Sequence, residues 1–491
     1  MGHGVETMEK AANAGSAEFH GAPMKKEAAE AELAKLTPLP ELTKKYEPHR
    51  RKLSAKPAAW TSIDPVQKPE RVITAEKGAV RKDFGALHVR SLMKADSRIV
   101  VLHGDLAGSG GFDKVEKDFP ERVINCGAAE ANMYMMAAGL RQAGMLPVTY
   151  TFAAFGTNEA RANARLIDIN SGHVACSVLH DCTHAGLSVG EDGETHQERN
   201  YLNIPFDRTQ VWVPADSNQA AAMAEKALAL VAEGRQSVYV FSGRSNHPQL
   251  LTPKGEPIYG KDYRFDGDID LVRGAGDFSD RVTVLACGES VHTAVAVADA
   301  LAAREEPIRV RVLNVACVRP LDASTVMAAA LETGRLLVIE DHHSEGGLAT
   351  QVADLLADFQ LPCSLRRLGV NHYFPSGPSE DLKLLAGLDP DSLADAIEDE
   401  IRTEIAGGED ILVTAVHTLP HHLTHSRFRP RARAFVDRLL HEKGYLERLR
   451  EEWGKRSVPP GKFPTNDRLR KQLGQVQDND MMDATKGGRH S

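Results

Sequence analysis

Short apolar runs alternate with helix-like stretches along most of this chain, and this alternation is the feature that most constrains its fold. The runs lie at residues 99–103, 122–126, 174–180, 210–214, 237–241, 282–287, 309–315, 335–341 and 364–370. Runs of this length, separated by helices and glycine-containing loops, are typical of parallel strands covered on both faces. The sequence therefore predicts an α/β protein with two doubly wound, mostly parallel-sheet domains.

The 491 residues divide around these runs into five segments. We expect an N-terminal extension at 1–76, a first α/β domain at 77–250, a linker at 251–278, a second α/β domain at 279–405 and a C-terminal extension at 406–491. A helix is expected between residues 24 and 36. The C-terminal extension holds His421, His422, His425 and the arginine-rich stretch 427–433. We interpret it as a solvated helical appendage, although its basic residues also suit a partner or an anionic surface.

Charge and cysteine content narrow the function classes. The chain has 59 basic and 68 acidic residues, a net charge of -9, and no strong basic block in its central region, which argues against a nucleic-acid partner. Its six cysteines are scattered without a CxxC pair, as expected of packing residues in a reduced cytosolic protein. The sequence shows no signal peptide and no apolar run long enough for a membrane span. We therefore expect a cytoplasmic protein.

Polar loops follow three strands of the first predicted domain. They are residues 104–111 (GDLAGSGG), 127–130 (GAAE) and 183–197 (THAGLSVGEDGETHQ). Ligands of open parallel sheets gather at the carboxyl ends of the strands, so these loops are expected to line one crevice.

Each loop taken alone also fits a structural role. The glycines at 104–111 lack the ending of a phosphate-binding P-loop and suit a turn. Glu130 suits a carboxylate at a helix N-terminus. His180 and His184 have no evident third ligand, so no metal site is predicted. The density of ionisable groups at 184–196, however, exceeds what a merely structural loop needs.

The run 184–197 resembles the sugar-binding loop of transketolases and their near relatives. Supporting motifs follow in order: Asp105-Leu106, residues 127–133 (GAAEANM), 151–155 (TFAAF), 213–216 (VPAD) and 341–348 (DHHSEGGL). The resemblance covers roughly residues 77–403. It implies a pyrimidine-binding domain of a thiamine-diphosphate enzyme, followed by the C-terminal domain of the family.

The resemblance also implies roles for single residues. Glu130 is expected to contact N1′ of the thiamine aminopyrimidine, where a carboxyl group sharing a proton favours the reactive imino tautomer. Phe152 and Phe155 are expected to stack on the pyrimidine, although phenylalanines at a strand end are also ordinary core residues. Asp105 completes the expected cofactor contacts.

A second group of residues is expected to meet the sugar. His184, His196 and Asp192 match residues that orient sugar hydroxyls, and the two histidines also assist proton transfer. Ser109 and Arg244 match positions that hold a sugar phosphate, for which a planar guanidinium is well suited, and Arg81 is expected at the same anion site.

The chain departs from full-length transketolases in two ways. The domain that binds magnesium and the diphosphate through a GDG motif is missing, and Asp266-Gly267-Asp268 lacks its context. We therefore expect a separate N-terminal subunit that holds Mg²⁺, and a heterotetramer in which a dimer of this chain pairs with two such subunits. Ala131 also stands where many transketolases have histidine, which leaves the donor and acceptor range open.

The leading hypothesis is transfer of a two-carbon ketol unit from a ketose to an aldehyde acceptor, and Arg244 and Ser109 suggest that the ketose is phosphorylated. A deoxyxylulose-phosphate-synthase-like reaction and the β subunit of a 2-oxo acid dehydrogenase are the enzymatic alternatives. The form E-D-G-x-T-H-Q at 191–197 counts against the second. A scaffold subunit that has lost the chemistry is the alternative of another class, and the retained Glu130 and His184 argue against it.

Overall fold

The computed structural model describes residues 5–14, 24–35, 62–74, 78–402, 405–406, 419, 426–442 and 444–458. The chain forms two compact units, Met1–Ala59 and Trp60–Ser491. In the first unit, helices α1 (Glu6–Asn13) and α3 (Lys26–Lys35) are joined by hydrogen bonds from Thr7 to Glu32 and by a Lys35–Glu6 ion pair of 2.9 Å. The helix expected between residues 24 and 36 is thus present.

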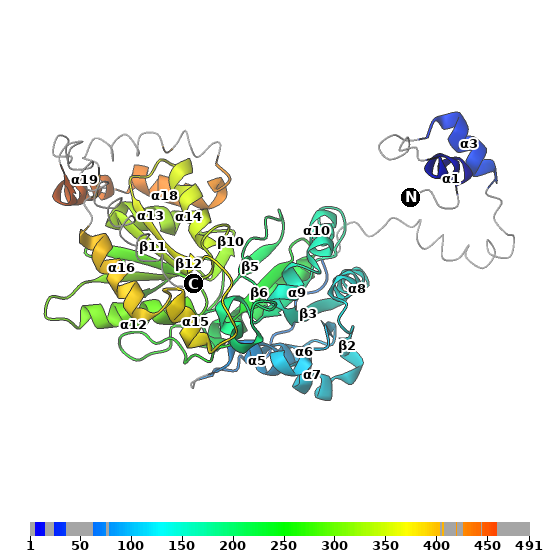
Figure 1. The fold of residues 1–491 in the computed structure, drawn as a ribbon, viewed down its shortest axis with the longest axis horizontal. Coiled ribbons are helices and arrows are strands. Elements are labelled where there is room, and N and C mark those ends of the chain that lie inside the picture. The colour runs from blue at the N-terminus through cyan, green and yellow to red at the C-terminus, as the bar shows by residue number, and fades with distance from the viewer. Residues whose placement is uncertain are drawn as a thin grey trace, which may run out of the picture. The chain divides into compact units, whose positions relative to one another are not determined.

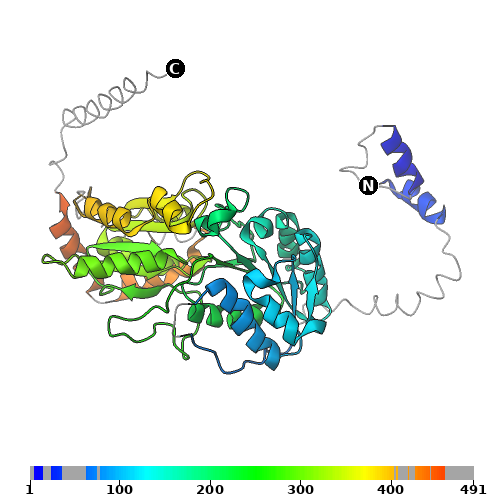
Figure 2. The same cartoon turned by 60° about the horizontal axis from the view of Figure 1, so that its bottom comes forward.

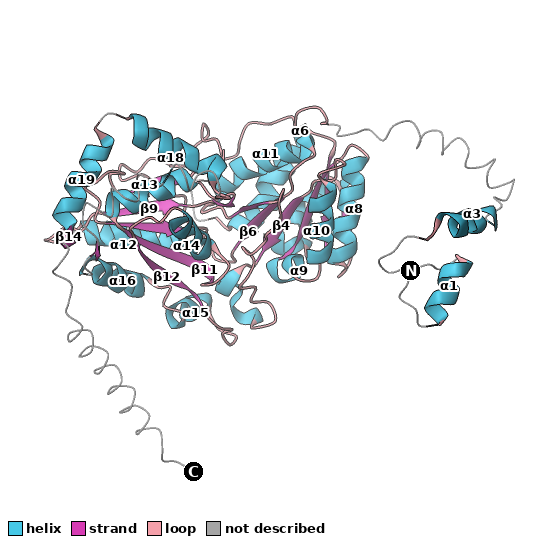
Figure 3. Ribbon diagram, turned by 90° about the horizontal axis from the view of Figure 1, so that it is seen from above, coloured by secondary structure: helices cyan, strands magenta, loops and turns pink. Residues whose placement is uncertain are grey.

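The second unit begins with a seven-stranded sheet, which Figures 1 and 3 show flanked by helices. Its strands are β1 (Ile99–His103), β2 (Val123–Asn125), β3 (Leu146–Phe152), β4 (Leu179–Thr183), β5 (Gln210–Trp212), β6 (Val238–Ser242) and β10 (Cys317–Arg319). The order is β10-β5-β6-β4-β3-β1-β2, and every pair is parallel except β10 with β5. The side chains of β1, β3, β4 and β6 are buried, as expected of strands covered on both faces.

Helices cover both faces of this sheet. One face packs against α8 (Glu130–Gln142) and α10 (Arg161–Asn170), and short α9 (Ala153–Thr157) follows β3. The opposite face packs against α5 (Val80–Asp83), the π-helix Phe84–Val89, α6 (Arg90–Ala95), α7 (Phe112–Asp118) and α11 (Ser217–Glu233). Local signals set the ends of α11: the Asp216 carboxylate accepts the Gln219 amide at 2.8 Å, and Gly234 closes the helix at φ 85°.

A five-stranded sheet follows, with the order β12-β11-β8-β9-β7. Its strands are β7 (Asp270–Arg273), β8 (Val282–Ala286), β9 (Val310–Asn314), β11 (Arg335–His343) and β12 (Ser364–Val370). Only the edge strand β7 runs antiparallel to its neighbour. Helices α12 (Ser290–Ala302) and α16 (Pro390–Arg402) cover one face, and α13 (Ala323–Thr333) and α14 (Leu348–Asp358) cover the other. Helix α15 (Ser379–Leu385) precedes α16.

The two sheets share one body of packed structure. Strand β10, which leads from the second sheet into α13, pairs with β5 through Cys317 and Trp212 and so becomes the edge of the first sheet. One continuous apolar cluster also extends from Met133 and Tyr134 on α8 to Val326 and Met327 on α13. Figure 2 shows the two sheets meeting along this junction.

The expected α/β class with two mostly parallel sheets is confirmed, but several details differ. The run at 174–180 was expected to be a strand, whereas the strand begins at Leu179 and ends at Thr183. Strand β3 was not among the expected strands, and the antiparallel strands β7 and β10 were not foreseen because three- and four-residue edge strands carry little periodicity. Part of the expected linker is therefore a sheet edge.

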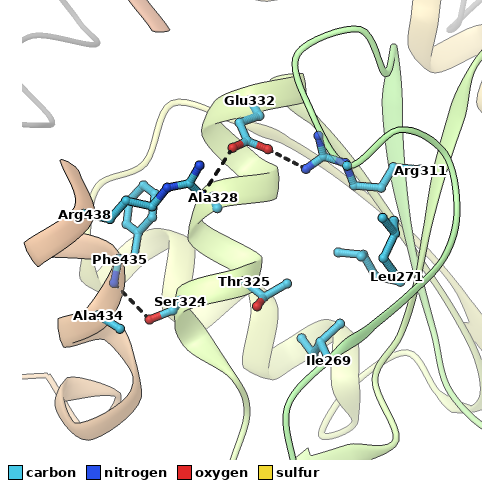
Figure 4. A pocket seen from close by; sticks show the side chains of 12 residues that line it. Ile269, Leu271, Arg311, Ser324, Thr325, Ala328, Glu332, Ala434, Phe435 and Arg438 are labelled. Carbon is cyan, nitrogen blue, oxygen red and sulfur yellow. Dashed lines mark hydrogen bonds and ion pairs between the residues drawn. The ribbon is translucent and has the colours of Figure 1, made fainter. Parts of the chain in front are cut away.

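Two helices of the C-terminal extension, α18 (Arg429–His441) and α19 (Tyr445–Arg456), dock on α13. The Tyr445 hydroxyl donates to Glu332 at 2.7 Å, and the Trp453 indole donates to the Leu331 carbonyl at 2.7 Å. Figure 4 shows Arg438 and Arg311 approaching Glu332 from the two sides of a cavity of about 300 Å³. The extension is therefore a packed part of the second α/β body over these residues, which corrects the expectation of a solvated appendage.

The remaining described elements are short. The 3₁₀ segments are Ala107–Gly110, Pro120–Arg122 and Gly186–Asp192, and β13 (Ile405–Ala406) pairs with β14 (Ser457–Val458). His421, His422 and His425 lie outside the described residues. Of the helices that the structure describes, none combines the length and apolar character needed to cross a bilayer.

We expect Glu332→Gln to destabilise the second α/β body. Glu332 is buried and lies 2.7 Å from Nη1 of Arg311, which is also buried. The substitution removes the negative charge that compensates this buried guanidinium. The free energy of unfolding should fall by about 2–4 kcal/mol, measured by urea denaturation followed by tryptophan fluorescence.

Glu398→Gln is the matched control, because Glu398 pairs with the half-exposed Arg304 on the surface. It should change the free energy of unfolding by less than about 1 kcal/mol. Equal effects of the two substitutions would contradict a docking role for Glu332.

Candidate active site

Glu130 occupies the first turn of α8, at the carboxyl ends of β1 and β3. Its side chain is buried, and its Oε1 accepts a hydrogen bond of 3.1 Å from the Thr151 hydroxyl. A β-carbon at Gly104 would lie 2.8 Å from the same oxygen, so a larger residue there would displace the Glu130 carboxylate from this position. The carboxyl group is thus fixed in position by two neighbouring strands.

Asp105 connects the loop after β1 to the loop after β2. Its backbone adopts φ 64°, and its Oδ1 accepts a hydrogen bond of 2.8 Å from the Asn125 amide. The side-chain Oδ1 of Asn125 in turn accepts a hydrogen bond from the Gly127 backbone amide at 2.9 Å. The two expected loops therefore form one rim, and Asp105 lies exposed on it.

Four aromatic rings gather where β3 and β4 end. Phe152 and Phe155 lie nearly parallel, with ring centroids 6.0 Å apart. The His184 ring contacts Phe152 at 3.9 Å, and the His196 ring meets Phe155 edge-on at 5.4 Å. The structure thus brings together the four side chains expected from the two separate motifs.

His184 is held in the neutral form. Its Nδ1 lies 2.8 Å from the Thr183 hydroxyl, and its backbone has φ 58°. Burial lowers the pKa of His184 to about 3, and the positive charges of Arg81 and Arg244 act in the same direction. A neutral imidazole has one donor and one acceptor nitrogen, which suits it to orienting a hydroxyl group.

Two arginines, Arg81 and Arg244, lie close enough to His184 for their charges to act on it. Arg81 donates to the Ser109 carbonyl, and its Nε is buried without a hydrogen-bond partner among the described residues. Burial, and secondarily the charge of Arg244, lowers the pKa of the Arg81 guanidinium. The Arg81 guanidinium is thus partly desolvated with an unused donor, which an anion could accept from.

The loop after β4 holds Arg244 in place. Arg244 Nη1 donates to the Val189 carbonyl at 3.0 Å and to Glu191 at 3.1 Å, and Asp192 lies 3.6 Å away. Arg244 remains partly exposed, so one side of the guanidinium is open to a ligand. His196 Nδ1 lies 2.9 Å from the Thr195 hydroxyl at the other end of this loop.

The second domain supports the backbone next to Arg244 through Glu289, a residue that the sequence analysis did not single out. Glu289 accepts the Ser245 amide at 3.0 Å and lies 2.7 Å from the Lys383 ammonium. Burial alone would raise the pKa of Glu289, but Lys383 and His247 outweigh it and hold that pKa below its usual range. This charged carboxylate fixes the backbone next to Arg244.

Asp341 makes a second link between the domains. It accepts the Leu187 amide at 2.8 Å, and a β-carbon at Gly186 would lie 2.4 Å from its carboxyl group. Burial raises the pKa of Asp341 to about 6, although Lys383 opposes that shift. Asp341, the first residue of the 341–348 motif, lies near the carboxyl end of β11, and Glu289 follows β8 by three residues, so the strand-end argument applied to that domain would have found both. No sequence signal points to Lys383, whereas Thr151 opens the motif at 151–155 without a role having been predicted for it.

His180 is a core residue. It is buried on β4, its Nδ1 lies 2.8 Å from the Thr149 hydroxyl, and its ring stacks on Tyr134 at 4.1 Å. No group of three or more histidine, cysteine or acidic side chains suited to a metal ion occurs in the described part of the chain.

The geometry agrees with two family comparisons. Residues 79–249 match the family model for the transketolase pyrimidine-binding domain, and residues 276–393 match that for the transketolase C-terminal domain. The protein therefore belongs to the class of α/β proteins that join these two domains in one chain, with the loops of both domains in contact.

The relatives define the family. A protein of Methanocaldococcus jannaschii described as a transketolase C-terminal section is 30% identical over 328 residues, which cover 66% of this chain and 97% of that protein. Rat transketolase is 30% identical over 338 residues, 67% of this chain and 50% of that protein. The chain belongs to the transketolase family and corresponds to the C-terminal part of a split transketolase. It spans about half the length of the curated full-length relatives it matches.

Solved structures support the same assignment. A chain titled "Split gene transketolase, inactive beta4 tetramer" is 30% identical with a TM-score of 0.54, and the match covers 66% of this chain and 98% of that one. Transketolase from Leishmania mexicana, at 21% identity and a TM-score of 0.55 over 77% of this chain and 53% of its own, shares the fold.

We expect His184 to stay uncharged between about pH 5 and 8, since a pKa lowered to about 3 means that the neutral form dominates at every higher pH. The ring ¹⁵N shifts of His184, assigned by comparison with His184→Gln, should stay constant over this range. A titration step in these shifts near pH 6.5, the ordinary histidine value, would contradict the burial of this ring.

Proposed function

We propose that this chain is the pyrimidine-binding subunit of a thiamine-diphosphate-dependent transketolase that works with a separate diphosphate-binding subunit. The carboxyl group of Glu130, fixed by Thr151 beside the Phe152–Phe155 pair, is the observation that carries the proposal. Thiamine diphosphate supplies the nucleophilic carbon that accepts a two-carbon ketol unit from a ketose and passes it to an aldehyde.

The residues of the crevice fit the aminopyrimidine end of that cofactor. Glu130 would hold a proton against a ring nitrogen, and its hydrogen bond from Thr151 fixes the direction of the carboxyl group. Phe152 and Phe155 offer apolar ring faces next to it. Asp105 stands on the rim of the same crevice, where it would contact the cofactor.

The other end of the crevice fits a phosphorylated sugar. Arg81 and Arg244 would bind the phosphate. Ser109 would lie beside it, because the Ser109 backbone carbonyl already accepts a hydrogen bond from Arg81. His184, His196 and Asp192 would orient the sugar hydroxyls. The two histidines would also carry protons to and from the oxygen atoms of the donor and acceptor sugars.

The magnesium ion and the diphosphate are assigned to the partner subunit. This chain matches the pyrimidine-binding and C-terminal domains of transketolase, and it is similar over two thirds of its length to a chain of a split-gene transketolase, which supports a separate subunit for the rest of the site. Two copies of this chain and two partner subunits would then form a heterotetramer with two complete sites.

Reconstitution with a diphosphate-binding partner, thiamine diphosphate and magnesium should produce ketol transfer from a ketose phosphate. Glu130→Ala should lower kcat by about 10²–10⁴-fold, because the substitution removes the group that exchanges a proton with the cofactor ring. Product formation is followed by chromatography of the sugar phosphates.

Glu121→Ala is the control, because the Glu121 side chain is 69% exposed and pairs with Arg122 on the surface. Its rate should equal that of the unmodified chain. Full activity in Glu130→Ala would refute the role of Glu130. Activity with pyruvate as the sole donor would instead assign the chain to the deoxyxylulose-phosphate-synthase-like alternative, and activity with neither donor would favour a scaffold.

An apolar face on α8 and α10 supports self-association. Met135 and Met136 on α8 and Leu166 and Ile169 on α10 are each more than a third exposed, and the two helices lie in contact. Contiguous exposed apolar side chains of this kind mark protein interfaces. Because α8 also carries Glu130, a second copy docked here would lie close to the crevice.

We expect Leu166→Glu with Ile169→Glu to shift the chain toward monomers, because the two carboxylates would have to be buried in the interface. Light scattering after size-exclusion chromatography measures the mass. The exposed pair Leu384 and Leu385 on α15, changed in the same way, is the control and should leave the mass unchanged. An unchanged mass in the α10 variant would place the interface elsewhere.

A further inference from the structure

A cavity of about 430 Å³ lies at the amino-terminal ends of β5 and β6. It is lined by residues 206–210 at the start of β5, by Gln236 before β6, by residues 319–321 at the end of β10, by Gln351 on α14, and by Arg427, Phe428 and Arg431 around the start of α18. The crevice described above lies at the opposite, carboxyl-terminal edge of the same sheet. The cavity is therefore a separate site, with a volume in the range of small-molecule sites.

Four arginine side chains line this cavity. They are Arg208, Arg319, Arg427 and Arg431. Three of them have partners outside the cavity. Arg427 pairs with Asp354, Arg431 lies 3.2 Å from Asp268, and Arg208 donates to the Asp168 carbonyl at 3.4 Å. These contacts hold the three guanidinium groups in place without filling the space between them.

Arg319 lacks such a partner. Its Nε is buried without a hydrogen-bond acceptor, and within the described ranges no carboxylate pairs with its guanidinium. Burial, and secondarily the charge of Arg427, lowers the pKa of Arg319, but a guanidinium stays protonated in proteins. Removing such a charge from water is costly unless an anion accompanies it.

The remaining walls suit the carbon body of a small molecule. Phe206 and Phe428 contribute aromatic rings, and Leu321 contributes an apolar side chain. Gln351 lines the cavity too and donates to the Val318 carbonyl at 2.9 Å, which ties α14 to the strand that carries Arg319. The lining thus combines four guanidinium groups and one carboxylate, Asp207, with apolar side chains, so its net charge is positive.

We propose that this cavity binds a small phosphorylated molecule, with its phosphate group on Arg319 and Arg208 and its carbon body against Phe206 and Phe428. Several guanidinium groups around one space favour a phosphate dianion, whose oxygen atoms accept paired N–H donors, over a single carboxylate. The site includes α18 residues, which lie outside the segments that match the family models. It does not depend on the crevice or on a partner subunit.

The test uses the full chain with Arg244→Gln, so that the anion site of the crevice is weakened. Ribose 5-phosphate, inorganic phosphate and ribose are titrated in turn by isothermal calorimetry. We expect saturable binding of ribose 5-phosphate, competition by inorganic phosphate and no binding of ribose. Adding Arg319→Gln should weaken binding of ribose 5-phosphate by about tenfold or more, as expected for the loss of a charge-assisted hydrogen-bond pair.

Arg281→Gln, added to the same background, is the matched control because Arg281 is exposed and does not line the cavity. Thermal unfolding shows whether each variant is folded, and Arg208→Gln replaces Arg319→Gln if the latter does not fold. Unchanged affinity in the folded cavity variant would overturn the proposal. So would the absence of saturable binding of both phosphates at millimolar concentration, and neither result would bear on ketol transfer at the crevice.

Discussion

The parallel pairing of β1, β3, β4 and β6 is the constraint on which the rest of the structure depends. The carboxyl ends of parallel strands lie at the same edge of the sheet, so the loops that follow these strands meet there. The Glu130 carboxyl, the Phe152 ring and the His184 ring reach one crevice for this reason. They are separated by as few as 22 and as many as 54 positions along the chain, yet the sheet register fixes their spacing.

The second domain acts on the crevice through buried charges. Glu289 and Asp341 hold the backbone beside Arg244 and the loop that begins at Gly186, and Lys383 offsets the charge of Glu289. A carboxylate in this setting stays ionised because the compensating ammonium is buried with it. The second domain therefore contributes to the shape of the crevice even though its own side chains stand behind the loops.

The extension at the C-terminus links packing to a second site. Helices α18 and α19 cover α13 through Tyr445 and Trp453, and the start of α18 brings two arginines to the cavity that contains Arg319. A helical hairpin that was merely exposed to solvent would not need a buried tyrosine and tryptophan. Because α18 docks on α13, several arginines of the stretch 427–433 contact the folded body instead of facing only solvent.

The sequence by itself determined the α/β class, the strand at Ile99–His103 and the group of side chains around Glu130, because buried parallel strands and the polar loops after them leave clear local patterns. Tertiary structure alone decided the edge strands β7 and β10, the support from Lys383 and the cavity at Arg319. Each of these depends on which distant segments pack together, and short edges or single charged residues carry no periodic signal of their own. The unpartnered Nε of Arg319 could be recognised only once its surroundings were known, since burial is a property of the packed chain.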